Sequence, residues 1–312
     1  MASPACRILL IGTALLSLGS LSAQTNPAVE TSRLFERSAP PTGGMVTPDG
    51  MALPQGEGST YEDESFGAQQ ILKTQEKIPA FTLGGSLSGF YTNNVALTRS
   101  NTISDSFLVG AAFFNWTPQI NPTLQFQFGA GVSFFRYWDT QELDFENVGT
   151  GVGLLWTPPN LGGLGFLVRY DFTELLDPGS NEILQDHEFS VALQKLLVLG
   201  RSHSLTFGVI GSVGISDPFS EQRDQIGFAV GYHLQLTRQL GSDLGYRLSG
   251  YFYNDGGRDD LNQVFSLGVH YYITPWASID GYVTGAVNSS NRAAFRYDVI
   301  STGGGAGLTV RF

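Results

Sequence analysis

The chain has 312 residues and carries few charges, with 17 Lys and Arg against 28 Asp and Glu, or 14% of the sequence together. The net charge of −11 argues against nucleic-acid binding, which favours basic surfaces. The one cysteine, Cys6, lies near the N-terminus, ahead of the first apolar run. Disulfides, cysteine nucleophiles and thiolate metal sites are therefore excluded from the rest of the chain.

Residues 1–23 have the pattern of a secretory signal peptide. Arg7 precedes the apolar run 8–16, and a small-residue cleavage site follows that ends at Ala23. The apolar run is shorter than the ~20 residues that a membrane-spanning helix requires. We therefore expect this segment to be removed on export, which leaves a mature chain without a thiol.

Residues 24–79 are rich in Pro, Gly, Ser, Thr and acidic side chains, and they lack apolar periodicity. This composition predicts a disordered leader on the periplasmic side. Residues 62–77 carry a few apolar side chains that would suit one short helix. If the following region encloses a lumen, the alternative is that part of the leader enters it as a plug.

From residue 80 to the C-terminus, apolar residues alternate with small or polar ones in one run after another. In the clearest run, 124–134, Leu124 and Phe126 alternate with Gln125 and Gln127. Runs of this kind predict about twelve strands. They lie near 81–92, 105–116, 123–136, 147–156, 164–174, 187–198, 204–214, 225–236, 244–253, 263–273, 277–287 and 298–312.

The connections between these strands alternate in kind. Short turns, such as 117–122, 238–243 and 274–275, alternate with longer or more acidic loops. Membrane barrels have this asymmetry, with short periplasmic turns and longer external loops. Tryptophan favours the membrane interface, and three tryptophans beside Thr-Pro turns predict an interfacial girdle: Trp116, Trp156 and Trp276.

The composition of this region favours a membrane barrel over a soluble all-β domain. A soluble domain needs a charged outer face, whereas the non-apolar face of these strands is mostly Gly, Ser, Thr and Gln. In a lipid-facing barrel, half of the strand residues face lipid and half face a polar lumen. An open sheet edge is not tolerated in hydrocarbon. We therefore predict an all-β fold, a closed antiparallel up-and-down transmembrane β-barrel over residues 80–312.

The C-terminal strand ends on an aromatic residue and has apolar residues at every second position: Leu308, Val310 and Phe312. This pattern resembles the assembly signal of bacterial outer-membrane β-barrel proteins, although Gly304 and Ala306 stand where larger residues are common. The resemblance covers 80–312 and is porin-like without pointing to one subfamily. It implies a place in the cell outer membrane, contact with lipid and lipopolysaccharide, assembly by the barrel-insertion machinery, and no cofactor.

If the apolar positions face lipid, the alternate positions line the lumen, and few of those are charged or titratable. Counting outward from the turns places three pairs opposite one another in the periplasmic half of the lumen, as a polar belt: His233 with Arg247, Arg247 with His270, and His270 with Asp280. The same count places Asp171 opposite Glu188, closer to the outer mouth. The candidate pore-lining residues are His233, Arg247, His270, Asp280, Arg169, Asp171 and Glu188.

These residues suit either a constriction that selects solutes or a salt-bridged network that packs a narrow barrel. About twelve strands lie between the small filled barrels and the wide aqueous porins. The sequence therefore predicts a passive channel for small polar solutes, and the alternative is a structural or surface-interaction barrel without an open pore. The serines and histidines lie in no recognisable catalytic motif, and no third ligand accompanies His233 and His270. We therefore expect neither an enzyme nor a metal site.

Overall fold

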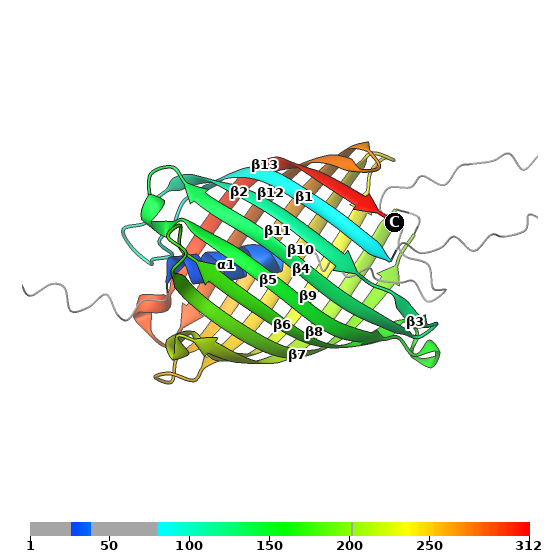
Figure 1. The fold of residues 1–312 in the computed structure, drawn as a ribbon, viewed down its shortest axis with the longest axis horizontal. Coiled ribbons are helices and arrows are strands. Elements are labelled where there is room, and N and C mark those ends of the chain that lie inside the picture. Colours follow the sequence, from blue (N-terminus) through cyan, green and yellow to red (C-terminus); the bar gives the residue numbers. More distant parts are fainter. Residues whose placement is uncertain (1–25, 39–79, 201) are drawn as a thin grey trace, which may run out of the picture.

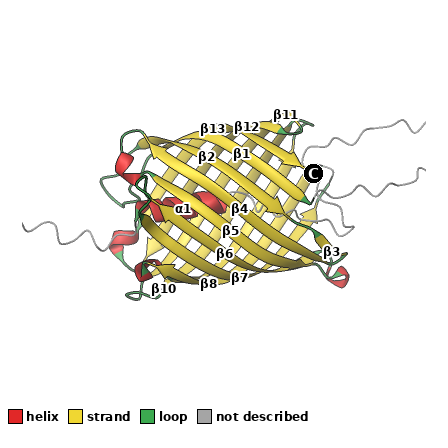
Figure 2. Ribbon diagram, viewed as in Figure 1, coloured by secondary structure: helices red, strands yellow, loops and turns green. Residues whose placement is uncertain are grey.

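The computed structural model describes residues 26–38, 80–200 and 202–312. In these residues, thirteen strands form one antiparallel sheet that closes on itself as a barrel (Figure 1, Figure 2). Twelve of the strands form the wall, and the short strand β3 pairs only with the start of β4. The predicted fold class is confirmed.

The wall strands are neighbours in chain order. The bounds of all thirteen strands are β1 (Phe81–Thr92), β2 (Asp105–Trp116), β3 (Gln119–Asn121), β4 (Leu124–Tyr137), β5 (Phe145–Trp156), β6 (Leu164–Leu176), β7 (Glu182–Val198), β8 (His203–Asp217), β9 (Arg223–Gln235), β10 (Leu240–Tyr253), β11 (Asp259–Thr274), β12 (Ala277–Ser290) and β13 (Tyr297–Arg311). The helical segments are α1 (Pro27–Ser38), η2 (Gln141–Leu143), η3 (Pro159–Leu161), η4 (Phe219–Glu221) and η5 (Ala293–Phe295). Each predicted strand corresponds to one wall strand. Several strands run further than predicted into the longer loops.

The first and last strands close the barrel. β1 pairs with β13 from Thr82 opposite Arg311 to Thr92 opposite Ser301. Beyond that ladder, the Phe81 N–H donates to the Phe312 carbonyl at 3.0 Å, and the Phe312 N–H donates to the Phe81 carbonyl at 3.1 Å. The two rings stack with centroids 5.6 Å apart. The Phe312 end of the chain therefore completes the seam.

Replacing Phe312 with alanine is expected to weaken the seam and keep its two backbone hydrogen bonds. A stacked aromatic pair contributes ~0.5–1.5 kcal/mol beyond the area it buries. The urea midpoint for unfolding from lipid vesicles should fall for Phe312→Ala, while Phe312→Tyr, which keeps the ring, should match the parent. Equal midpoints for alanine and tyrosine would show that the ring contributes nothing to closure.

The two ends of the barrel differ. We call the end that holds Phe81 and Phe312 the turn end, and the opposite end the loop end. The segments η2, η4 and η5 lie at the loop end (Figure 2). No helix within the described ranges is long and apolar enough to cross a membrane.

The outer surface of the wall is apolar. On β13, Ile300, Leu308 and Val310 point outward and are exposed, whereas Ser301 between them points inward and is buried. The exposed rings of Trp116, Trp156 and Trp276 all lie at the turn end, where a girdle was predicted. Their place at a membrane interface stays a prediction.

The α1 helix lies inside the barrel, in the half nearer the loop end (Figure 1). The expectation of a disordered leader is wrong for residues 27–38, and the alternative that part of the leader enters the lumen fits them. The predicted signal peptide 1–23 and the helix predicted at 62–77 lie outside the described residues.

The start of α1 is encoded locally. The Asn26 side-chain oxygen accepts the Ala28 N–H at 3.0 Å, and the Asn26 carbonyl accepts the Val29 N–H at 3.0 Å. Pro27 is the first helical residue, where the N–H that proline lacks has no partner within a helix. Glu30 places a negative charge in the first turn, which the helix dipole favours.

Candidate functional site in the lumen

Aromatic rings hold one side of α1 against the wall. The Phe35 ring packs edge-on against Phe90 of β1, Phe107 of β2 and Phe135 of β4, with centroids 5.0, 5.5 and 5.7 Å apart. Ala28 and Val29 belong to the same buried apolar cluster. This contact partly buries the Phe35 ring, the largest apolar side chain described in α1.

Other sides of the helix meet other strands. Leu34 packs in a cluster with Val264 of β11 and Ala286 of β12. On the β5 side, the Asn147 amide donates to the Ser32 hydroxyl at 3.3 Å. Every side chain from 28 to 34 is buried. Because α1 contacts strands on several sides of the barrel, it occupies the lumen at the loop end.

Glu30 makes a further polar contact between α1 and the wall. Its Oε1 accepts the Tyr253 hydroxyl at 3.1 Å, and it lies 3.6 Å from Arg33 Nη1, 3.9 Å from Arg258 Nη2 and 4.0 Å from Arg223 Nη1. Burial raises the pKa of the Glu30 carboxyl, but the nearby guanidinium groups outweigh burial and hold that pKa below its ordinary value. Glu30 therefore carries its charge inside the lumen.

Arg33 reaches the loop end from the same helix. Its Nη1 donates to Glu221 Oε2 of η4 at 3.2 Å, and its Nη2 donates to the Glu221 carbonyl at 3.2 Å. Burial raises the pKa of the Glu221 carboxyl above its ordinary value, although Arg33 opposes the shift. Two opposite charges on α1, Glu30 and Arg33, thus find partners on the barrel.

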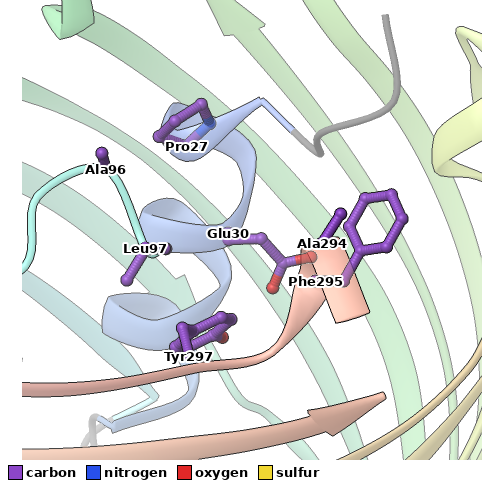
Figure 3. Close-up of a pocket in the computed structure, with 7 residues that line it drawn as sticks. All are labelled: Pro27, Glu30, Ala96, Leu97, Ala294, Phe295 and Tyr297. Carbon is purple, nitrogen blue, oxygen red and sulfur yellow. The ribbon is translucent and has the colours of Figure 1, made fainter. Parts of the chain in front are cut away.

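A small pocket remains where α1 meets the loops at this end. Figure 3 shows Glu30 extending from α1 toward η5, which carries Ala294 and Phe295. The pocket is lined by Pro27, Glu30, Ala96, Leu97, Ala294, Phe295 and Tyr297. This side of the barrel mouth is therefore built jointly by α1, the 93–104 loop and η5.

Nearer the turn end, four strands contribute to one hydrogen-bonded chain, which we call the histidine–aspartate chain: His233, Asp243, His270, Asp280 and Ser278. Asp243 lies between the two histidines, 2.8 Å from His233 Nδ1 and 3.0 Å from His270 Nε2. His270 Nδ1 lies 2.7 Å from Asp280 Oδ1, and the Ser278 hydroxyl donates to Asp280 Oδ2 at 2.9 Å. The chain crosses β9, β10, β11 and β12 on the inner face.

The geometry indicates the protonation of both imidazoles. Both ring nitrogens of His270 face carboxylate oxygens, and only a doubly protonated ring can donate to both. His233 Nε2 faces Gln235 Oε1 at 3.3 Å, and the Gln235 amide nitrogen already donates to the Thr237 carbonyl. His233 therefore donates from both nitrogens as well. Two imidazolium and two carboxylate groups make the histidine–aspartate chain neutral overall.

The predicted belt is correct in one pairing and wrong in two. His270 lies opposite Asp280 as predicted. His233 lies opposite Asp243, and Arg247 lies opposite Ala229 and Val264. The strand β10 begins at Leu240, inside the segment interpreted as a turn, so the count placed Arg247 four residues too close to the turn end. Arg247 still lies on the inner face of β10, two inward positions from Asp243.

The predicted pairing of Asp171 with Glu188 has the expected register. Asp171 on β6 lies opposite Glu188 on β7. Arg169 Nε donates to both oxygens of Asp171, at 2.7 and 2.8 Å. Charged groups therefore lie on the inner faces of β6 and β7 as well as along the histidine–aspartate chain. Their role in lining a pore stays a prediction.

Sequence reasoning missed the residues that hold α1. Arg223 and Arg258 were assigned to an outer loop, and Glu30 was assigned to a disordered leader. The signal for α1 was available in Asn26 followed by Pro27, a helix start in a segment whose prolines were interpreted as part of a disordered composition. Nothing local marks Arg223 and Arg258 as partners of Glu30, because the three come from distant parts of the chain.

No protein-family model matches the chain, and no curated protein matches its sequence. Among solved structures, the COG4313 outer membrane channel from Pseudomonas putida F1 has a TM-score of 0.54 at 10% identity, covering 80% of this chain and 99% of that one. An anion-selective porin from Comamonas acidovorans has a TM-score of 0.40 at 8% identity, covering 74% and 98%. The beta domain of the Bordetella autotransporter BrkA has a TM-score of 0.43 at 8% identity, covering 74% and 100%.

At these identities the likeness concerns the fold alone, and the two looser matches carry no argument. The chain has the fold of the outer-membrane β-barrel proteins, as its sequence resemblance predicted. The barrel has twelve wall strands, and α1 lies in its lumen.

Proposed function

We propose that the protein is an outer-membrane channel for small polar solutes, and that α1 closes its lumen at the loop end. The observation that carries the proposal is that a helix, and not the wall side chains alone, fills the loop end of the barrel. Wall side chains fill small barrels of about eight strands. Here the loop end is filled by a separate helix, and a helix with its side chains is about 10–12 Å across. Without α1, the wall would enclose a space of about that width.

The lining of the turn half supports the same proposal. The histidine–aspartate chain lies on the inner faces of β9, β10, β11 and β12, and it is neutral overall. A neutral polar wall suits polar solutes of either charge. The name of the Pseudomonas putida protein, a channel, agrees with this proposal.

The proposed location is the outer membrane, with the turn end toward the periplasm and the loop end outside. The apolar outer surface and the tryptophans at the turn end support this orientation. We propose no catalytic role. Each of the four histidines already pairs with a carboxylate or a phenol, His187 with the Tyr170 hydroxyl at 2.8 Å and His203 with the Tyr232 hydroxyl.

The test is the conductance of the refolded chain from Gln24 in a planar bilayer. Deleting residues 27–38 should produce discrete ohmic steps, because the loop half of the lumen then empties. The intact chain should conduct little or only in brief openings. The control removes an equal length of the leader, residues 45–56, and should behave like the intact chain.

If the variant that lacks residues 27–38 showed no conductance steps, this would contradict the channel and would favour the alternative, a structural or surface-interaction barrel. Equal conductance in all three chains would contradict closure by α1. Folding of each variant is checked first by the mobility difference between heated and unheated samples in gel electrophoresis.

A further inference from the structure

The 93–104 loop, which joins β1 to β2, folds into the mouth of the barrel and meets α1. Its side chains Val95 and Leu97 are buried. Val95 belongs to the same buried apolar cluster as Val29 of α1, and Leu97 belongs to the cluster of Leu34. Figure 3 shows the loop reaching the helix at Leu97. The apolar side chains of the loop are therefore buried together with those of the helix.

Two asparagines fix the folded form of this loop. Asn94 is buried, its Nδ2 donates to the Thr98 carbonyl at 2.7 Å and to the Asp298 carbonyl at 2.8 Å, and its Oδ1 accepts the Thr98 N–H at 3.1 Å. Asn93 Oδ1 accepts the Ile300 N–H at 2.8 Å. These hydrogen bonds close the first turn of the loop and tie it to β13.

The folded loop holds one residue in a strained backbone conformation. Leu97 has a φ of 50°, in the left-handed region, where the Cβ atom crowds the following carbonyl oxygen. Such a conformation persists only where its surroundings over-determine it. Leu97 gains its burial in the cluster that contains Leu34 of α1. The strain is therefore offset by packing that includes the helix.

The same loop connects α1 with the outside of the barrel. Residues 94, 95 and 97 are buried, whereas every residue from 99 to 104 is exposed. A displacement of the exposed part therefore changes the contacts that the buried part makes with α1.

We propose that the 93–104 loop is a latch for α1: the folded loop and the docked helix stabilise each other, and lifting the loop from the mouth frees the helix. The inference rests on the proposed function, because it names the step that opens the channel. If the loop lifts, α1 loses its contacts with Val95 and Leu97. If α1 leaves, these two side chains face an aqueous lumen, and Leu97 keeps its strain with less packing. A coupling of this kind is reciprocal.

A thiol on α1 reports the helix while the loop is perturbed. The chain from Gln24 has no cysteine, so Ser32→Cys gives it a sole thiol. Ser32 is 1% exposed and contacts Asn147 of β5, so a maleimide should react with this thiol slowly while α1 is docked. Asn94→Ala loosens the loop and leaves every side chain of α1 in place, and it should make the reaction about tenfold faster.

Asn291→Ala is the matched control, in the loop between β12 and β13 at the same end of the barrel. Asn291 Oδ1 accepts the Asp259 N–H at 3.1 Å, and its Nδ2 donates to the Gly257 carbonyl at 3.0 Å. The substitution removes the same kind of hydrogen bonds, and the thiol should react as in the parent. A rate in Asn94→Ala no higher than in this control would overturn the latch.

Trypsin reports the loop while the helix is removed, and it needs no substitution in the loop. Arg99 is already exposed, so cleavage after it depends on local unfolding of the loop. Deleting residues 27–38 should make this cleavage about tenfold faster, whereas deleting residues 45–56 should leave its rate unchanged. Equal rates in the two deletion chains would show that the loop keeps its fold without the helix, and the proposal would be wrong.

The latch and the channel fail separately. A barrel that stays silent after deletion of 27–38 would overturn the channel, and labelling and cleavage would still report the latch. A barrel that conducts after that deletion, while Asn94→Ala labels like its control, would keep the channel and overturn the latch.

Discussion

Replacing Phe35 with alanine is expected to release α1 from the wall. The ring packs against three phenylalanines on three strands, at centroid distances of 5.0 to 5.7 Å. Truncating a phenylalanine in such a cluster costs about 3 kcal/mol. That shifts the docking equilibrium by roughly a hundredfold. Ser32 is buried in α1, and Ser32→Cys gives a chain that begins at Gln24 its sole thiol. The reaction of that thiol with a maleimide should accelerate accordingly, and channel openings should become frequent.

The matched control is Phe219→Ala. Phe219 lies in η4 at the loop end, but it is 57% exposed and packs outside the Phe35 cluster. Its loss should change neither labelling nor conductance. If Phe35→Ala labelled as slowly as the control, the aromatic contact would not be what keeps α1 in the lumen, and the ion pairs of Glu30 and Arg33 would have to hold it.

The wall of the barrel is predictable from sequence, because a strand with one apolar and one polar face shows a two-residue alternation in its sequence. The run 124–134 lies within β4, and its alternation survives in the structure as outward phenylalanines and inward glutamines. Register is harder, because it depends on the residue at which each turn begins. Pro275 marks one turn sharply, and the pairing of His270 with Asp280 across it is correct.

The turn before β10 has no such marker. Gly241, Ser242 and Asp243 have turn composition, yet the ladder with β9 continues through them to Gly241 opposite Gln235. Asp243 was therefore assigned to the turn, and the residue that links the two histidines was missed. The helix α1 was missed for a related reason. Its stability comes from contacts with strands far away in sequence, and a short helix has little stability of its own.

The other large effect is expected at Asp243. In a chain that lacks residues 27–38, Asp243→Asn should make the pore prefer anions at pH 5. The carboxylate lies between His233 and His270, and replacing it removes one of the two negative charges that balance the two imidazolium groups. A charge about 4 Å from an ion in water is worth ~1 kcal/mol. The chloride to potassium permeability ratio should therefore rise about fivefold, measured as a reversal-potential shift in a KCl gradient.

The pH dependence distinguishes the charge from a change of shape. In Asp243→Asn, His270 keeps Asp280 as its partner, but His233 has no carboxylate partner. An imidazole of that kind loses its proton as pH rises past neutrality, so the anion preference of Asp243→Asn should vanish by pH 9. The control is Asp298→Asn, which removes the same charge from the exposed outer face of β13 and should leave selectivity unchanged. If both variants shifted equally, total charge would set the selectivity. If neither did, ions would pass without approaching the histidine–aspartate chain, and that chain would serve to pack the wall.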